Sequence, residues 1–139
     1  MLIGSYQHNI DAKGRVIIPA KFREELGEVF YATKGTDASV TVMSKEAWET
    51  LGEKIAALPS SKTKDVRRFL FSGAAELVPD KQGRVLLPQV LRDHACLQKD
   101  VVIIGTGSVA EIWDAQRWEA YNEALAESQV LEVMDLYEL

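Results

Sequence analysis

The chain has 139 residues, of which 47% are hydrophobic and 27% are charged. This is the composition of a soluble globular protein and excludes a chain that is disordered throughout. The formal net charge is −5, which taken alone argues against nucleic acid as a partner. The charge is uneven, because residues 1–72 hold 11 Lys and Arg against 9 Asp and Glu, whereas residues 73–139 hold 5 against 12. The acidic total therefore leaves room for a local basic surface.

The sequence also indicates the cellular compartment of the protein. Its first residues contain no basic segment that leads into an apolar run, so we expect no signal peptide. No stretch approaches the roughly 18 apolar residues of a membrane span, so we expect no membrane partner. The single cysteine, Cys96, has no second cysteine in the chain to pair with, which favours a reducing compartment. We therefore expect a cytoplasmic protein.

An internal repeat organises the chain. Residues 11–23 recur as residues 80–92 with six of 13 positions identical, and both segments begin with the pattern Asp-x-x-Gly-Arg. The match resumes further on, where Trp48-Glu49 corresponds to Trp118-Glu119. A period this long predicts two copies of one supersecondary unit. Because a unit of roughly 60 residues rarely buries enough apolar area alone, we expect the two copies to share a core with pseudo-twofold symmetry.

Both copies predict the same elements in chain order. An extended segment precedes each Asp-x-x-Gly-Arg turn and a short β-rich run follows it, which indicates a hairpin. Pro19 and Pro88 then suit the first position of a short helix. Two more strands follow in each copy, and a closing helix begins after Ser44 or Asp114 as N-cap. The expected strands span residues 3–10, 16–18, 29–33 and 40–43, then 75–79, 85–87, 101–104 and 110–113.

The composition between and after the copies completes the domain organisation. Residues 59–64 have the composition of a linker, and residues 65–72 predict a helix that carries Arg67 and Arg68. The last ten residues are amphipathic and acidic, and they are either a helix docked on a neighbour or a frayed end. We expect a first repeat with its closing helix, a linker with a basic helix, a second repeat with its closing helix, and an acidic tail, at residues 1–59, 60–73, 74–127 and 128–139.

The turn residues have a structural interpretation and a functional one. Gly14 and Gly83 permit a positive φ or the close approach of a ligand to the backbone. Asp11 and Asp80 can accept hydrogen bonds from the N–H groups of their own turns, or they can orient the following arginine. The structural interpretation is a plain turn that holds a local ion pair.

The basic residues of the turn favour binding. Arg15 and Arg84 each carry a planar fork of donors that matches a phosphate group or the major-groove edge of guanine. Lys13 and Lys81 add cations at the same turns. Both copies keep the aspartate, the glycine and the arginine although the residues between them differ, and a turn needs its glycine but not its arginine.

The pattern Asp-x-Lys-Gly-Arg-Val-x-x-Pro resembles the AbrB-type swapped-hairpin β-barrel. Two copies in one chain of this length, separated by helices, resemble the MraZ family, and so do Gly4, Phe71–Ala74 and Glu111–Trp113. The resemblance implies an α+β fold in which two tandem AbrB-like β-hairpin/helix units form a pseudo-twofold swapped-hairpin β-barrel with flanking helices. It also implies a ring-shaped homo-oligomer, an octamer or a dodecamer.

The same resemblance implies a function. It indicates a nucleoid-associated, sequence-specific transcriptional regulator whose partner is double-stranded DNA, at direct repeats upstream of its own cell-division and cell-wall operon. The DNA-binding residues carry over to Lys13, Gly14, Arg15, Lys81, Gly83 and Arg84. The second copy departs from the pattern, because Gln82 stands where the first has Lys13. The second turn therefore either contacts DNA equally or mainly serves assembly.

Three alternatives remain beside this interpretation. The chain could be an antitoxin-like protein that binds DNA and a toxin, or an oligomeric scaffold that binds no DNA. An enzyme is disfavoured, because the sequence contains no phosphate-binding glycine-rich loop, no metal-ligand cluster and no nucleophile–base pattern. We accordingly expect no catalytic residue, no metal, no cofactor and no small-molecule substrate. Arg67 and Arg68 either contact DNA or pair with acidic residues of a neighbouring protomer.

Overall fold

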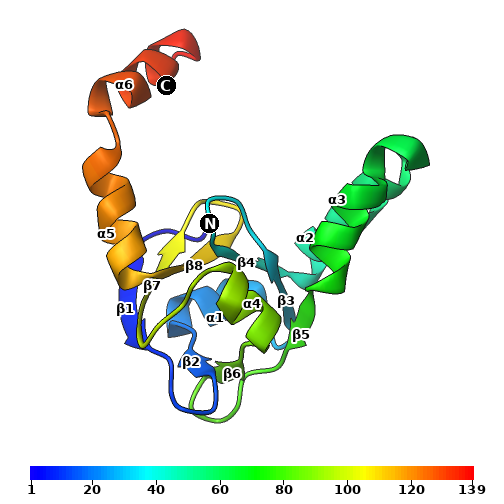
Figure 1. The fold of residues 1–139 in the computed structure, drawn as a ribbon, viewed down its shortest axis with the longest axis vertical. Helices are drawn as coiled ribbons and strands as arrows, with labels where there is room; N and C mark the ends of the chain where they lie inside the picture. Colours follow the sequence, from blue (N-terminus) through cyan, green and yellow to red (C-terminus); the bar gives the residue numbers. More distant parts are fainter.

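The computed structural model describes residues 1–139 and has a mixed α+β architecture with two arms (Figure 1). The first half contains β1 (Ser5–Asn9), β2 (Arg15–Ile17), α1 (Ala20–Leu26), β3 (Phe30–Lys34), β4 (Val40–Ser44), α2 (Lys45–Ala56) and α3 (Ser60–Ser72). The second contains β5 (Ala75–Leu77), β6 (Arg84–Leu86), α4 (Gln89–His94), β7 (Asp100–Gly105), β8 (Ala110–Asp114), α5 (Ala115–Ala124) and α6 (Glu127–Leu136). The order of elements is the same in both halves, as the repeat predicts.

The eight strands form two antiparallel sheets that join the halves. The larger sheet has the order β1-β7-β8-β4-β3-β5, and the smaller one pairs β2 with β6. Each outer strand of the larger sheet therefore lies beside a strand of the other half, β1 beside β7 and β5 beside β3. The two halves also meet at β4 and β8 in the middle of that sheet. Neither half has a sheet of its own, which explains why two short units share one fold.

The pairing corrects the expected local hairpin. The strands before and after each Asp-x-x-Gly-Arg turn do not pair with each other, because β1 and β5 belong to the larger sheet while β2 and β6 form the smaller one. The turn itself is tight, but the chain diverges directly after it. Each short strand finds its antiparallel partner in the equivalent strand of the other half, which has the same length and apolar pattern.

One hydrophobic core serves both halves. A cluster of 18 buried side chains includes Phe22 and Phe30 from the first half and Leu91 and Ile112 from the second. The helical spacing of Phe22 with Leu26, and of Leu91 with Ala95, predicts these buried faces, and all four side chains are buried. A smaller cluster of Val102, Ile104 and Trp113 lies against Trp118 of α5. Strand β7 is therefore buried on both faces, which accounts for its continuous apolar run.

The helix starts follow local chemistry. Ser44 Oγ accepts a hydrogen bond from the N–H of Ala47 at 3.2 Å, and Asp114 Oδ2 accepts one from the N–H of Arg117 at 3.2 Å, so both expected N-caps are confirmed. Pro19 and Pro88 precede α1 and α4 as N-caps with extended backbone. The sequence predicts each proline at the first helical position, and the structure places each one residue earlier, at the N-cap.

The segment expected as a linker is helical. Helix α3 begins at Ser60, directly after Pro59, and includes all of residues 60–64. Thr63 explains the difference, since its side chain is buried and its hydroxyl donates to the carbonyl of Pro59 at 3.2 Å. Helices α2 and α3 form one arm of the molecule, and α5 and α6 form the other (Figure 1). None of these helices has the length and apolarity that a membrane crossing needs.

Candidate nucleic-acid interface

The two Asp-x-x-Gly-Arg turns, loop 1 (residues 11–15) and loop 2 (residues 80–84), close in the same way. In loop 1 the N–H of Asp11 donates to the carbonyl of Arg15 at 2.9 Å, and the N–H of Gly14 donates to the carbonyl of Asp11 at 3.0 Å. Asp80, Arg84 and Gly83 repeat both bonds at 2.9 Å in loop 2. The backbone thus forms the same tight turn twice.

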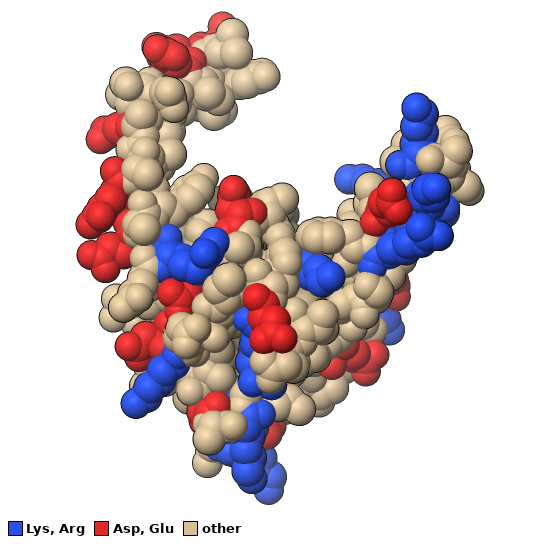
Figure 2. Space-filling view, viewed as in Figure 1, with Lys and Arg blue, Asp and Glu red and all other residues tan.

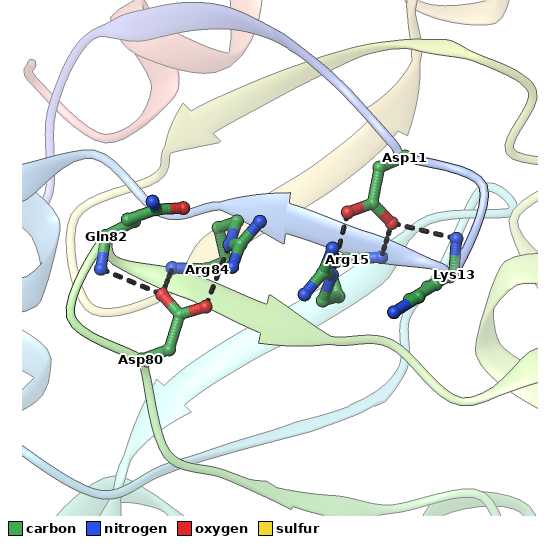
Figure 3. A network of polar contacts seen from close by, with 6 residues as sticks. All are labelled: Asp11, Lys13, Arg15, Asp80, Gln82 and Arg84. Carbon is green, nitrogen blue, oxygen red and sulfur yellow. Dashed lines mark hydrogen bonds and ion pairs between the residues drawn. The ribbon is translucent and has the colours of Figure 1, made fainter.

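The aspartate of each loop organises the residues that follow it (Figure 3). Asp11 Oδ1 accepts hydrogen bonds from the N–H groups of Lys13 and Arg15, both at 2.9 Å. Its Oδ2 lies 2.7 Å from Nε of Arg15. The sequence left open whether the aspartate serves the turn or the arginine, and it serves both.

Loop 2 repeats this arrangement with one different residue. Asp80 Oδ1 accepts from the N–H groups of Gln82 and Arg84 at 2.9 Å, and its Oδ2 lies 2.8 Å from Nε of Arg84. In both loops the carboxylate engages the arginine through Nε, so the two terminal guanidinium nitrogens are left for a ligand. A guanidinium presents such nitrogens as a fork that matches a phosphate or a guanine edge.

The hydrogen bonds also set the charge state of both aspartates. The pKa of Asp11 lies below its usual value, first because the backbone N–H of Arg15 donates to it, and then because the Arg15 side chain and the N–H of Lys13 do so. Partial desolvation opposes this effect. The pKa of Asp80 is lowered for the same reasons, with the N–H of Arg84 as the largest cause. Both carboxylates are therefore ionised at neutral pH and hold their arginines as charged partners.

The two arginines lie on one face of the β2–β6 ladder, which we call the ribbon. In the ribbon Arg15 is paired with Leu86, and Ile17 is paired with Arg84. Because side chains alternate along a strand, these four residues share the outward face. Their exposures agree, since Ile17 and Leu86 are 38% and 58% exposed while Val16 and Val85 on the opposite face are buried.

Each loop is supported by the other half of the chain. The carbonyl of Gly14 accepts a hydrogen bond from the N–H of Leu87, and that of Gly83 accepts one from the N–H of Ile18, both at 3.0 Å. A Cβ atom on Gly14 would lie 2.8 Å from Cζ of Arg92, whose helix belongs to the second half.

The reciprocal contact has the same geometry. A Cβ atom on Gly83 would lie 2.7 Å from Cζ of Arg23. The two glycines also have φ values of +87° and +80°, in the region that favours glycine. The turn thus favours glycine, and a Cβ atom at either position would displace the guanidinium that packs against it.

The lysines of the site are exposed. Lys13 and Lys81 project from loops 1 and 2 with exposed side chains, but they occupy different positions in the two turns. Figure 2 shows basic side chains gathered at the pole of the molecule that carries the loops, opposite the tips of the arms. The structure therefore brings together all of the site residues that the sequence predicts, on one pole.

Sequence reasoning overlooked two kinds of residue here. Ile17 and Leu86 lie on the outward face, each opposite one of the arginines, and the alternation of strand residues was the signal that could have found them. The second kind is the pair Arg23 and Arg92 on α1 and α4, whose place behind the loops the sequence does not give. Their contact with the glycine of the opposite half depends on how the halves pack, and no sequence pattern encodes it.

Comparison with known proteins gives a consistent result. The family model described as "MraZ protein, putative antitoxin-like" matches twice, at residues 1–69 and 70–134. Three similar relatives carry the name transcriptional regulator MraZ. They come from Heliobacterium modesticaldum (54% identity over 92% of this chain and 91% of the relative), Acetivibrio thermocellus (54% over 88% and 87%) and Clostridium tetani (50% over 89% and 89%). The two matches of the model, together with these relatives, show that the chain belongs to the MraZ family of transcriptional regulators.

Proposed function

We propose that this chain is a sequence-specific DNA-binding transcriptional regulator that contacts duplex DNA with loops 1 and 2 and the ribbon between them. The observation that carries the proposal is the outward face of the ribbon. It presents Arg15 and Arg84, one from each repeat, and each is held through Nε with its terminal nitrogens free.

The dimensions and charges of this surface suit DNA. The major groove of B-form DNA admits a two-stranded β-ribbon, and guanine offers O6 and N7 to an arginine fork. Lys13 and Lys81 flank the ribbon as flexible cations that suit phosphate contacts. Ile17 and Leu86 supply exposed apolar contacts, which match the methyl group of thymine. The surface thus combines groups for phosphate contacts with groups for base contacts.

The resemblance to the family extends the proposal to targets and assembly. The regulator acts in the cytoplasm, at the nucleoid, on direct repeats upstream of its own cell-division and cell-wall operon. It does so as a ring-shaped homo-oligomer, an octamer or a dodecamer, in which each copy offers one ribbon to one repeat. Each protein copy contains two repeats of its own, residues 1–59 and 74–127. Each of these contributes one loop, and together they form a pseudo-twofold swapped-hairpin barrel.

Fluorescence anisotropy tests the proposal. A labelled duplex from upstream of the protein's own operon and a scrambled duplex are titrated with the wild type, Arg15→Ala and Arg117→Ala. Arg117 is the matched control, because its exposed side chain lies on α5, away from the loops. We expect preference for the operon duplex and a loss of about tenfold or more in affinity with Arg15→Ala alone. Weak, equal binding of both duplexes that Arg15→Ala leaves unchanged would contradict the proposal and favour an oligomeric scaffold.

A further inference from the structure

The ribbon has a pseudo-twofold axis at its centre. Val16 pairs with Val85 there, and a twofold rotation about this pair exchanges Arg15 with Arg84. A twofold-symmetric protein surface matches a palindromic DNA element and fits it equally well in both orientations. The direct repeats proposed above have a polarity instead. Each copy therefore needs a chemical difference between the two ends of its ribbon to bind every repeat in the same orientation.

Most groups on this surface do not supply such a difference. Each loop holds one aspartate, one lysine and one arginine, so the two ends of the ribbon have equal formal charge. Ile17 and Leu86 occupy equivalent outward positions, and both are aliphatic and exposed. Gln82 is the exception, because it is the only neutral side chain in either loop that both donates and accepts hydrogen bonds.

Gln82 and Lys13 occupy equivalent positions in the two loops. The N–H of Gln82 donates to Asp80 Oδ1 at 2.9 Å, and the N–H of Lys13 donates to Asp11 Oδ1 at the same distance. Both side chains are exposed and lie at opposite ends of the ribbon (Figure 3). Gln82 is hydrogen-bonded within the chain only through its backbone, so its side-chain amide is free. The same turn thus presents an ammonium group at one end and an amide at the other.

The two side chains suit different base edges. A lysine ammonium only donates hydrogen bonds, so Lys13 suits a phosphate or the two acceptors of guanine. A glutamine amide donates and accepts at once, and adenine offers the matching N7 acceptor and N6 donor in the major groove. We propose that Gln82 reads an adenine at the loop 2 end of each repeat, and that this contact sets the orientation of each copy on the DNA. The inference rests on the DNA binding proposed above and adds the residue that distinguishes the two ends of the repeat.

Removing N7 of adenine tests the contact. The base 7-deazaadenine has a carbon in place of N7 and still pairs with thymine. A labelled duplex with one repeat from upstream of the protein's own operon is prepared with each adenine in turn replaced by this base. Affinity is measured by anisotropy for the full-length wild type, Gln82→Ala, Lys13→Ala and the control Arg117→Ala. All three side chains are exposed, so we expect the variants to fold, which circular dichroism checks.

The expected result is a loss that depends on Gln82. The wild type and Arg117→Ala should lose about tenfold in affinity when one particular adenine is replaced, and little at the others. Gln82→Ala should bind the unmodified duplex about tenfold more weakly than the wild type and be insensitive to that replacement, because the group that used N7 is gone. Lys13→Ala is the matched change in loop 1, and it should bind more weakly but keep the sensitivity.

A second variant tests the same contact by a change of preference. In Gln82→Glu the amide is replaced by a carboxylate of similar size, which only accepts hydrogen bonds and so matches the N4 donor of cytosine. This variant should prefer a duplex in which cytosine replaces the sensitive adenine and guanine replaces its partner. An unchanged preference for adenine would contradict the assignment of Gln82.

The outcomes that overturn the inference are distinct from those that overturn the proposed function. Sensitivity to 7-deazaadenine that persists in Gln82→Ala would show that another group reads the adenine. A wild type that is insensitive at every adenine, but prefers the operon duplex over a scrambled one through Arg15, would overturn the inference and leave the proposed function in place. A Gln82→Ala variant with altered mass in light scattering and unchanged affinity would assign loop 2 to assembly. No preference for the operon duplex would overturn the proposed function itself.

Discussion

Loops 1 and 2 share one backbone and one aspartate–arginine geometry, but they carry their lysines at different positions. The bonds from aspartate to the two backbone N–H groups and to Nε of arginine agree within 0.1 Å between the loops. Lys13 is one of the residues whose N–H binds the aspartate, whereas Gln82 holds that place in loop 2 and Lys81 precedes it. The arginine is therefore part of the framework that both loops share, while the lysine is a variable addition to it.

The largest expected effect tests whether the two loops contribute equally to DNA affinity. Arg15→Ala and Arg84→Ala each remove one guanidinium from the outward face of the ribbon. We expect each to weaken binding to the operon duplex by roughly 1–3 kcal/mol, as for the loss of one arginine–guanine pair. The two losses, measured by anisotropy, should be of similar size. No loss with Arg84→Ala would show that loop 2 serves assembly instead of DNA.

The second prediction concerns the glycines of both loops. Gly14→Ala and Gly83→Ala combine a strained positive φ with a Cβ atom 2.8 or 2.7 Å from a guanidinium carbon. Gly107→Ala is the matched control, since Gly107 has φ +95° and no atom within 4 Å of its Cβ position. We expect the loop variants to lower the free energy of unfolding by about 1–2 kcal/mol more than the control does, in urea titrations. Equal losses at all three positions would remove the role assigned to the guanidinium contact.

The third prediction concerns the arginine side chain that packs behind each loop. Arg92→Ala removes the side chain behind loop 1, and Arg23→Ala removes the one behind loop 2. We expect the amide NMR signal of Gly14 to shift with Arg92→Ala and that of Gly83 to shift with Arg23→Ala, each far more than the other. Affinity for the duplex should fall by about fivefold in both variants, because a cation near the DNA is lost. Shifts confined to the half that carries the substitution would contradict the conclusion that each loop is supported by an arginine of the other half.

A smaller effect is expected from the lysines that distinguish the loops. Lys13→Gln makes loop 1 resemble loop 2 at this position, and Gln82→Lys makes the opposite change. If Lys13 contacts one phosphate, Lys13→Gln lowers the slope of log affinity against log salt by about 0.9, and Gln82→Lys raises it by a similar amount. The measurement is anisotropy across a salt series. Slopes that do not change would place both positions outside the contact with DNA.

The smallest effect concerns acid stability. The pKa values of Asp11 and Asp80 both lie below the usual value of 3.8. Each carboxylate therefore stabilises the folded state above that pH, and its contribution is lost as the pH falls through the lower folded pKa. Urea titrations between pH 2 and 6 should show less dependence on acid for Asp11→Asn and Asp80→Asn than for the wild type or Asp135→Asn. A wild-type profile in both loop variants would contradict the lowered pKa values.

Much of the fold can be predicted from sequence where local chemistry decides it. The repeat predicts two equivalent sets of elements, Ser44 and Asp114 predict their helix starts, and the spacing of Phe22 and Leu91 predicts buried faces. Strand pairing is different, because β1 and β5 find partners far along the chain and nothing in their sequences names those partners. Only the beginning of α3 was missed, because the sequence predicts a helix at residues 65–72 and the burial of Thr63 outweighs the linker composition of residues 59–64.

The candidate site likewise contains residues that the sequence predicts and contacts that it does not. The residues of loops 1 and 2 are found from the duplicated motif, because a repeated Asp-x-x-Gly-Arg is visible in the sequence itself. The outward position of Ile17 follows from strand alternation once β2 is known. The contact of Arg92 with Gly14 depends on how one half packs on the other, so it emerges only from the folded chain.

The most direct test of the account is methyl NMR of the wild type during titration with the operon duplex. Loops 1 and 2 and the ribbon form one DNA-binding surface in this account. The methyl signals of Ile17 and Leu86 should therefore both shift, while those of the buried Ile55 and of Val133 in α6 stay in place. Shifts of Val133 or of α3 methyl groups without shifts of Ile17 and Leu86 would contradict the account and place the DNA on the arms.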